Sequence, residues 1–205
     1  MHTHLLTIAA LFIAVSAPQI TAADLAAHLE GRPKAYSVDM TMTNDGKTTK
    51  IHQSIDGDHF RIESSAGGRT SVSILNRTER KMVVLVTANK MAMEMPLSEE
   101  LAKKINQDPS EEMKGKANPA GSETIKGIVC DKFETVSEAG QKGTLWMNQQ
   151  DHTMVRWTSE STKQTVDYDN YKIGPQPAEL FVIPAGFQKM AMPAPPASPT
   201  PKSAP

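Results

Sequence analysis

The chain has 205 residues, which suits one domain, and its 22 basic and 23 acidic side chains give a formal net charge of −1. Basic and acidic residues are interspersed, as where Glu99-Glu100 is followed by Lys103-Lys104. We therefore expect no uniformly basic surface that could bind phosphate groups. We therefore expect no nucleic-acid partner. Cys130 is the only cysteine, so no intramolecular disulfide can form, and a small buried hydrophobe is favoured over a reactive thiol.

Residues 1–23 have the pattern of a cleavable secretory signal peptide. An apolar run from Leu5 to Val15 precedes the small residues Thr21-Ala22-Ala23, and the first charged residue is Asp24. This apolar run is shorter than the ~20 residues that span a bilayer, so a membrane anchor is not expected. Met1 to His4 contains no Lys or Arg, which departs from the usual basic start of a signal peptide. The pattern predicts a periplasmic or secreted protein that is soluble rather than membrane-spanning.

The body of the chain starts with a short helix and continues as strands. Residues 24–30 have an acidic start and leucines four apart, and Gly31 with Pro33 ends this helix. Tyr36, Val38, Met40 and Met42 then alternate with polar residues, which is typical of a half-buried strand. Turn residues such as those of 44–46 and 56–57 separate further strands. These strands are expected near 51–55, 60–62, 72–74, 82–86 and 91–95.

A helical interruption follows and the strands then return. Ser98 caps a predicted helix over 98–106, and 107–121 are interpreted as a loop. Strands at this regular spacing indicate an antiparallel sheet, a sandwich or a curved partial barrel, within one domain at 24–192. The Pro-, Ala- and Ser-rich residues 193–205 are interpreted as a disordered tail. The second set of strands is expected over 125–130, 133–136, 145–147, 154–158 and 166–171.

Catalytic motifs are absent from the sequence. It contains no nucleophile elbow, no His pair at helical ligand spacing and no phosphate-binding Gly loop. Asp56, Asp58 and His59 could ligate a metal, but an Asp-Gly hairpin turn explains the same residues and is favoured. We therefore expect no enzymatic activity, no metal and no cofactor.

Methionine is abundant, with 12 residues in the chain. Met91, Met93 and Met95 share one strand face, and Met40 with Met42 share another. Thioethers at this spacing can bind Cu(I), or they can fill a core or line an adaptable apolar cavity. Since no His or Cys stands beside the stripe, core or cavity lining is favoured.

A series of motifs in a fixed order carries a family resemblance. The motifs are AYSVDMTM, GDHFRIE, KMAMEMPL, GSETIKGIVCDKF, GTLWM and KIGPQPAELFVIPAGFQKM, and they cover nearly all of residues 35–190. The series resembles an uncharacterised family of exported bacterial domains that is similar to the lipoprotein-localisation (LolA/LolB-like) superfamily. The resemblance implies a mainly β, α+β fold: a curved antiparallel sheet that forms an unclosed half-barrel, with short helices covering an apolar cavity.

The same resemblance implies a binding or carrier protein for a lipid or acyl chain, and the candidate partners are a lipid or an acylated protein. An acyl chain can bind an apolar concavity without specific polar contacts, because each buried CH₂ contributes about 0.8 kcal/mol. The alternative is a non-enzymatic module that binds another envelope protein. The candidate ligand-lining residues are Tyr36, Val38, Met40, Met91, Met93 and Met95.

Overall fold

The computed structural model describes residues 22–97, 117–136 and 140–191, which form one α-helix, two short 3₁₀ helices and twelve strands. The helices are α1 (Ala22–Gly31), η1 (Thr87–Asn89) and η2 (Ala178–Phe181). The first six strands are β1 (Ala35–Asn44), β2 (Lys47–Asp56), β3 (His59–Ala66), β4 (Arg69–Asn76), β5 (Lys81–Val86) and β6 (Met91–Pro96). The others are β7 (Ala117–Ile125), β8 (Ile128–Val136), β9 (Lys142–Asn148), β10 (Met154–Ser159), β11 (Gln164–Ile173) and β12 (Gln188–Ala191).

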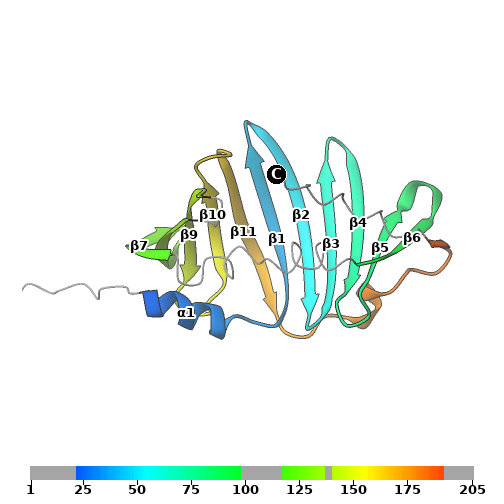
Figure 1. Ribbon diagram of the computed structural model, residues 1–205, viewed down its shortest axis with the longest axis horizontal. Coiled ribbons are helices and arrows are strands. Elements are labelled where there is room, and N and C mark those ends of the chain that lie inside the picture. The colour runs from blue at the N-terminus through cyan, green and yellow to red at the C-terminus, as the bar shows by residue number, and fades with distance from the viewer. Residues whose placement is uncertain (1–21, 98–116, 137–139, 192–205) are drawn as a thin grey trace, which may run out of the picture.

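All twelve strands belong to one sheet. Strands β1 to β6 form an antiparallel meander, β7 to β11 form a second, and β11 pairs with β1 to join them. At one end β12 adds to β6 in parallel, and at the other end lies β7. These end strands do not pair with each other within the described chain, so the sheet curves without closing (Figure 1). The predicted fold class, an unclosed antiparallel half-barrel, is confirmed.

The two faces of the sheet carry different coverings. We call the face against which α1 packs the inner face. There Leu25 and Leu29 of the helix join Phe133, Leu145 and Met147 in one buried cluster. Because side chains alternate across a strand, the pairing registers assign every other strand residue to this face.

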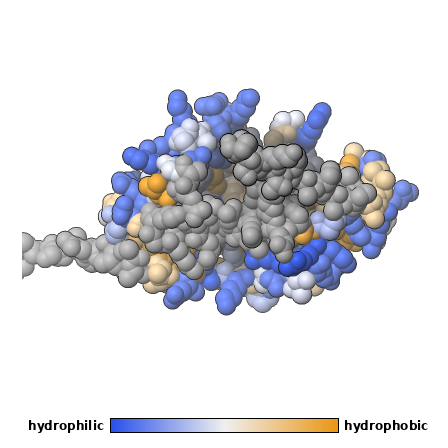
Figure 2. Space-filling view, viewed as in Figure 1, coloured by the Kyte–Doolittle hydropathy of each residue, from blue (hydrophilic) through white to orange (hydrophobic). Residues whose placement is uncertain are grey.

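The opposite face, here the outer face, receives the segment that follows β11. In that segment Phe181, Ile183 and Phe187 pack on a cluster around Val72 and Ile74 of β4. The guanidinium of Arg61 donates a hydrogen bond to the carbonyl of Leu180 at 3.2 Å. Hydrophilic residues occupy the upper and lower margins of the molecule, where the strands end in turns (Figure 2).

One predicted loop is partly a strand. The expected loop over 107–121 ends in β7, which begins at Ala117 and pairs with β8 despite Pro119 and a register shift. Pro119 is tolerated because β7 is an edge strand, where one side of the strand has no neighbour to receive a hydrogen bond. The predicted strand at 125–130 is likewise divided by a turn at Lys126-Gly127, where both residues have positive φ, 50° and 83°.

Other predictions lie outside the described residues. They are positions 1–21 of the signal peptide, the helix at 98–106 and the tail at 193–205. The domain limits also stay predictions. Among the described residues, no helix has the length and apolar character needed to cross a bilayer.

Gly143 provides a test of the packing between β9 and β10. A Cβ at this position would lie 2.5 Å from the backbone carbonyl oxygen of Thr158, closer than a real contact. We expect Gly143→Ala to lower the free energy of unfolding by roughly 1–3 kcal/mol, because the two strands would have to separate. Urea unfolding measures the loss. Thr144→Ala, on the outer face of the same strand, is the control, and equal stability of the two variants would contradict this packing.

Candidate functional site

The inner face carries an apolar row that crosses six neighbouring strands. The registers pair Met95 with Met82, Leu75 with Met82 and with Phe60, and Phe60 with Ile55, which in turn pairs with Tyr36. With strands about 4.8 Å apart, this first row runs about 24 Å along the sheet. The members of the first row, from β6 to β1, are Met95, Met82, Leu75, Phe60, Ile55 and Tyr36.

On the inner face, the rows that follow the first row along the strands are more polar. The second row is Met93, Val84, Ser73, Ile62, Gln53 and Val38. In the next row Ser64 and Ser71 lie opposite each other, and their hydroxyls are 2.6 Å apart. Apolar side chains therefore occupy every strand only in the first row, where Tyr36, Phe60 and Leu75 are buried and the other three members are half-buried.

All six residues predicted to line a cavity have their side chains on the inner face. Met95, Met93 and Met91 lie on β6 in the first, second and third rows. Tyr36, Val38 and Met40 occupy the same three rows on β1. Tyr36 and Val38 are buried and the four methionines are half-buried. The structure thus brings two distant strands to one face, and their contact with a ligand stays a prediction.

The three tyrosines of the chain extend the inner face onto β11. The ring centroids of Tyr36 and Tyr171 are 5.5 Å apart, and Tyr168 packs on the cluster beneath α1. A bulge at Asn170, with φ of 55°, turns Tyr171 toward Tyr36. Burial raises the pKa of both Tyr168 and Tyr171 above the ordinary value of 10.0. Their hydroxyls therefore stay protonated and can donate hydrogen bonds.

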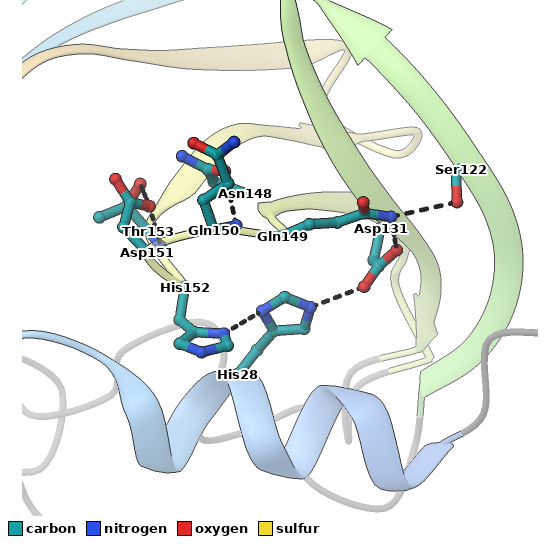
Figure 3. A network of polar contacts seen from close by, with 9 residues as sticks. All are labelled: His28, Ser122, Asp131, Asn148, Gln149, Gln150, Asp151, His152 and Thr153. Carbon is teal, nitrogen blue, oxygen red and sulfur yellow. Dashed lines mark hydrogen bonds and ion pairs between the residues drawn. The ribbon is translucent and has the colours of Figure 1, made fainter.

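A buried polar network joins α1 to the sheet (Figure 3). His28 of α1 is only 4% exposed, and its Nε2 lies 2.8 Å from the Oδ2 of Asp131 on β8. Its Nδ1 lies 2.9 Å from the Nδ1 of His152, in the turn between β9 and β10. The amide of Gln149 donates to the other carboxylate oxygen of Asp131 at 2.6 Å.

This network attaches α1 to the sheet. If Nε2–H of His28 donates to the carboxylate, its Nδ1 accepts the hydrogen bond from Nδ1–H of His152, and a neutral pair of imidazoles lies beside one carboxylate. The nearby hydroxyl of Ser122 contacts Gln149 at 3.4 Å rather than an imidazole. This arrangement holds the helix and lacks the nucleophile–base contact that acyl transfer uses.

The sequence assigns no functional role to His28, Asp131 or His152. His28 is 103 positions from Asp131 and 124 from His152, so no local spacing could have grouped them. Their proximity depends on the docking of α1 across β8 and β9, which is a tertiary event.

The metal candidate in the sequence has other partners in the fold. Asp58 accepts a hydrogen bond from the hydroxyl of Thr78 at 2.8 Å, and Asp56 accepts one from the backbone N–H of Gln176 at 3.0 Å. The ring of His59 packs beside Phe181, with centroids 5.7 Å apart. No cluster of three His, Cys, Asp or Glu side chains suited to a metal occurs within the described ranges.

A pocket of about 560 Å³ lies on the outer face beneath the segment around η2. Ile74, Val83 and Phe181 supply apolar walls, and its rim is charged. These charges are already matched, because Lys81 lies 3.2 Å from Glu79 and Lys189 lies 3.7 Å from Glu94.

A second hollow, of about 410 Å³, lies over the bulge of β1 and β11. Its walls include Asp39, His52 and Asn170. Hydrogen bonds from His52 and Asn170 hold the pKa of Asp39 below its usual value. The carboxylate in this hollow is therefore already engaged by its neighbours.

Comparison with known families gives one match. The family described as "Domain of unknown function (DUF4412)" matches residues 36–167, which is more than half of the chain. The chain belongs to the DUF4412 family. No curated protein matches this family member in sequence.

Solved structures share the fold at low sequence identity. An uncharacterized conserved protein from Thermus thermophilus has a TM-score of 0.61 and 11% identity, over 83% of this chain and 99% of that one. A chain of the Pseudomonas aeruginosa MucA/MucB complex has a TM-score of 0.50 and 11% identity, over 77% of this chain. The match spans 59% of that second protein. Identities this low establish a common fold alone.

The half-buried tyrosines Tyr168 and Tyr171 predict how stability depends on alkaline pH. Because the folded state raises the pKa of Tyr168 and Tyr171 above 10.0, the unfolded chain binds fewer protons than the folded one above about pH 10. The contribution of these two groups to the free energy of unfolding is fully present below about pH 10 and decreases as the pH rises further. We expect the Tyr168→Phe, Tyr171→Phe double variant to lose less stability between about pH 9 and 11 than the wild type. Parallel urea titrations measure the difference, and equal losses would contradict burial of the phenols.

Gly31 tests the attachment of α1. A Cβ at this position would lie 2.6 Å from Cδ2 of His152, so Gly31→Ala should displace that imidazole from His28. We expect a loss of roughly 1–3 kcal/mol of unfolding free energy, although alanine favours a helix over glycine. In a His152→Ala background the same change should cost little, because the clash is gone. A double-mutant cycle measures this coupling, and additive costs would show that the two residues do not meet.

Proposed function

We propose that this DUF4412 protein is an exported, non-enzymatic binding or carrier protein whose inner face holds a lipid or acyl chain. The observation that carries the proposal is the first row, an unbroken set of apolar side chains across six strands. Half-buried methionines flank this row on β6 and β1. The proposal also agrees with the LolA/LolB-like resemblance of the sequence.

The apolar row suits a flexible chain ligand. Each CH₂ that moves from water onto this surface contributes about 0.8 kcal/mol, so affinity can accumulate along the row without directed bonds. The methionines add adaptability, because an unbranched thioether can adopt several rotamers against an irregular guest. Serines and Gln53 on the neighbouring rows limit how far an apolar guest can extend toward the other end of the strands.

Binding rather than catalysis is the better account of the polar groups. The His28–Asp131 pair attaches α1, and the hydroxyl of Ser122 in Figure 3 is hydrogen-bonded to Gln149. The signal peptide pattern of residues 1–23 supports export, so we propose that the protein acts in the periplasm or outside the cell.

The second candidate function is an interaction module for another envelope protein. It is favoured by the shared fold with a chain of the MucA/MucB complex, at a TM-score of 0.50. The two proposals differ in what fills the inner face. A carrier retains small amphiphiles after purification, whereas an interaction module retains a protein.

The carrier proposal is tested by extraction and by probe binding. Organic extraction of protein purified from its native compartment, followed by mass spectrometry, should recover lipid or fatty acid in stoichiometric amount. The delipidated protein should bind the fluorescent apolar probe 1-N-phenylnaphthylamine. We expect Met93→Gln to weaken probe binding about threefold to tenfold, since it places a polar amide on the second row.

The matched control is Glu94→Gln, which changes the adjacent residue on the outer face of the same strand. It should bind the probe like the wild type. Both variants are first checked for unchanged thermal unfolding. A wild-type protein that carries no lipid and binds no probe would refute the carrier proposal and leave the interaction module.

A further inference from the structure

Arg77 lies beside the middle of the first row, in the turn between β4 and β5. Its guanidinium carbon is 4.0 Å from the centroid of the Phe60 ring, and Phe60 is a buried member of that row. The turn is fixed by backbone hydrogen bonds, from the N–H of Arg77 to Asp58 and from that of Arg80 to Arg77. A permanent positive charge is thus held against the apolar surface proposed to bind a ligand.

This guanidinium has an unused donor. The Nε of Arg77 is buried and has no hydrogen-bond partner among the described residues. A buried N–H without an acceptor costs free energy, so such groups in folded proteins call for an explanation. Stacking on Phe60 satisfies one face of the guanidinium plane, but its N–H groups point along the edges of that plane and still need acceptors.

The charged groups around Arg77 do not complete its hydrogen bonding. Burial lowers the pKa of Arg77, and the nearby Asp58 and Tyr36 oppose that effect. The Oδ2 of Asp58 instead accepts the hydroxyl hydrogen bond of Thr78 at 2.8 Å. Arg77 has no ion pair with any carboxylate of the described residues. The group that Arg77 lacks is therefore an anionic oxygen beside Phe60, in the middle of the first row.

A second guanidinium adds positive charge near the tyrosines. The charge of Arg32, which follows α1, acts on Tyr168 and Tyr171 and opposes the rise of their pKa. The ring of Tyr36, a member of the first row, lies 5.5 Å from that of Tyr171. Acidic groups are also near, since Asp151 raises the pKa of Tyr171 and Asp58 acts on Arg77.

The other buried donor without a partner in the described residues is Nε1 of Trp157, which is also on the inner face. Trp157 lies opposite Val166, and Val166 opposite Met42, so it belongs to the other end of the strands. An indole N–H is neutral and gives little preference for an anion over a neutral oxygen. Arg77 rather than Trp157 is therefore the donor that can distinguish an anionic from a neutral ligand.

We propose that the inner face binds an anionic single-chain amphiphile, with its acyl chain along the first row and its carboxylate or phosphate group at Arg77. This inference rests on the proposed carrier function and names its class of ligand. A carboxylate or phosphate oxygen would accept the hydrogen bonds that Arg77 cannot make within the described chain. A neutral lipid of equal chain length would leave the charge without a counterion.

The test compares three ligands of one chain length with the delipidated full chain. Oleate and 1-oleoyl-lysophosphatidic acid carry the anion, and monoolein is neutral. We expect at least one of the two anionic ligands to bind about tenfold more tightly than monoolein. Displacement of 1-N-phenylnaphthylamine measures the three affinities. This advantage should shrink as salt is raised, because the interaction is between charges at a partly exposed site.

Arg77→Gln should remove most of the anionic advantage and leave monoolein binding within about twofold. Arg77→Lys should retain part of the advantage, because it keeps the charge but loses the planar fork. The matched control is Arg69→Gln, an exposed arginine at the opposite end of β4, which should change neither affinity.

The outcomes separate the two proposals. Equal affinity for oleate, lysophosphatidic acid and monoolein in the wild type overturns the anionic assignment and leaves the carrier function standing. A loss of monoolein and oleate binding by the same factor in Arg77→Gln also overturns it, since the arginine would then act only through the packing of Phe60. If the wild type binds none of the ligands, the carrier function itself fails.

Discussion

Apolar side chains on an open sheet are buried only where another element packs on them, because a single layer of strands cannot cover its own faces. Here twelve strands form one curved layer, and its two ends are covered differently. At the β8–β9 end the inner face is covered by α1, with Leu25 and Leu29 in the cluster around Phe133. At the β4–β5 end the segment around Phe181 covers the outer face instead. The first row lies on the inner face of strands β1 to β6, and we assign the guest to its half-buried members.

One residue beyond β6 contributes to the inner face at this end. Leu97 is buried and forms a cluster with Phe60 and Leu75 of the first row. The row is thus partly covered by the chain itself near its centre, whereas the methionines on β6 are half-buried. A guest chain would therefore lie beside Leu97 and use the adaptable methionines as part of its wall.

The position of α1 is set by polar as well as apolar contacts. The carboxylate of Asp131 and the imidazoles of His28 and His152 form a connected hydrogen-bond network. Such a network favours one orientation of the helix, because another would leave these groups unpaired. Arg77 and Trp157 are the contrasting case, since their buried donors have no partner within the described residues. We therefore interpret the paired His28, Asp131 and His152 as a structural network, and we assign the unpaired donor of Arg77 to a ligand.

Periodicity along the chain was enough to predict the fold class, most strands and the face on which each residue of a strand lies, since side chains alternate with a period of two. It failed at β7, where Pro119 and Gly121 suggested a loop although an edge strand tolerates both. Folding was needed to show that β1 and β6, separated by four strands, present their side chains to one face, because that depends on the accumulated register of five strand pairs. Folding also brought Arg77 over Phe60 and His28 beside Asp131. Groups from different elements meet only when those elements pack together, so no spacing along the sequence encodes these contacts.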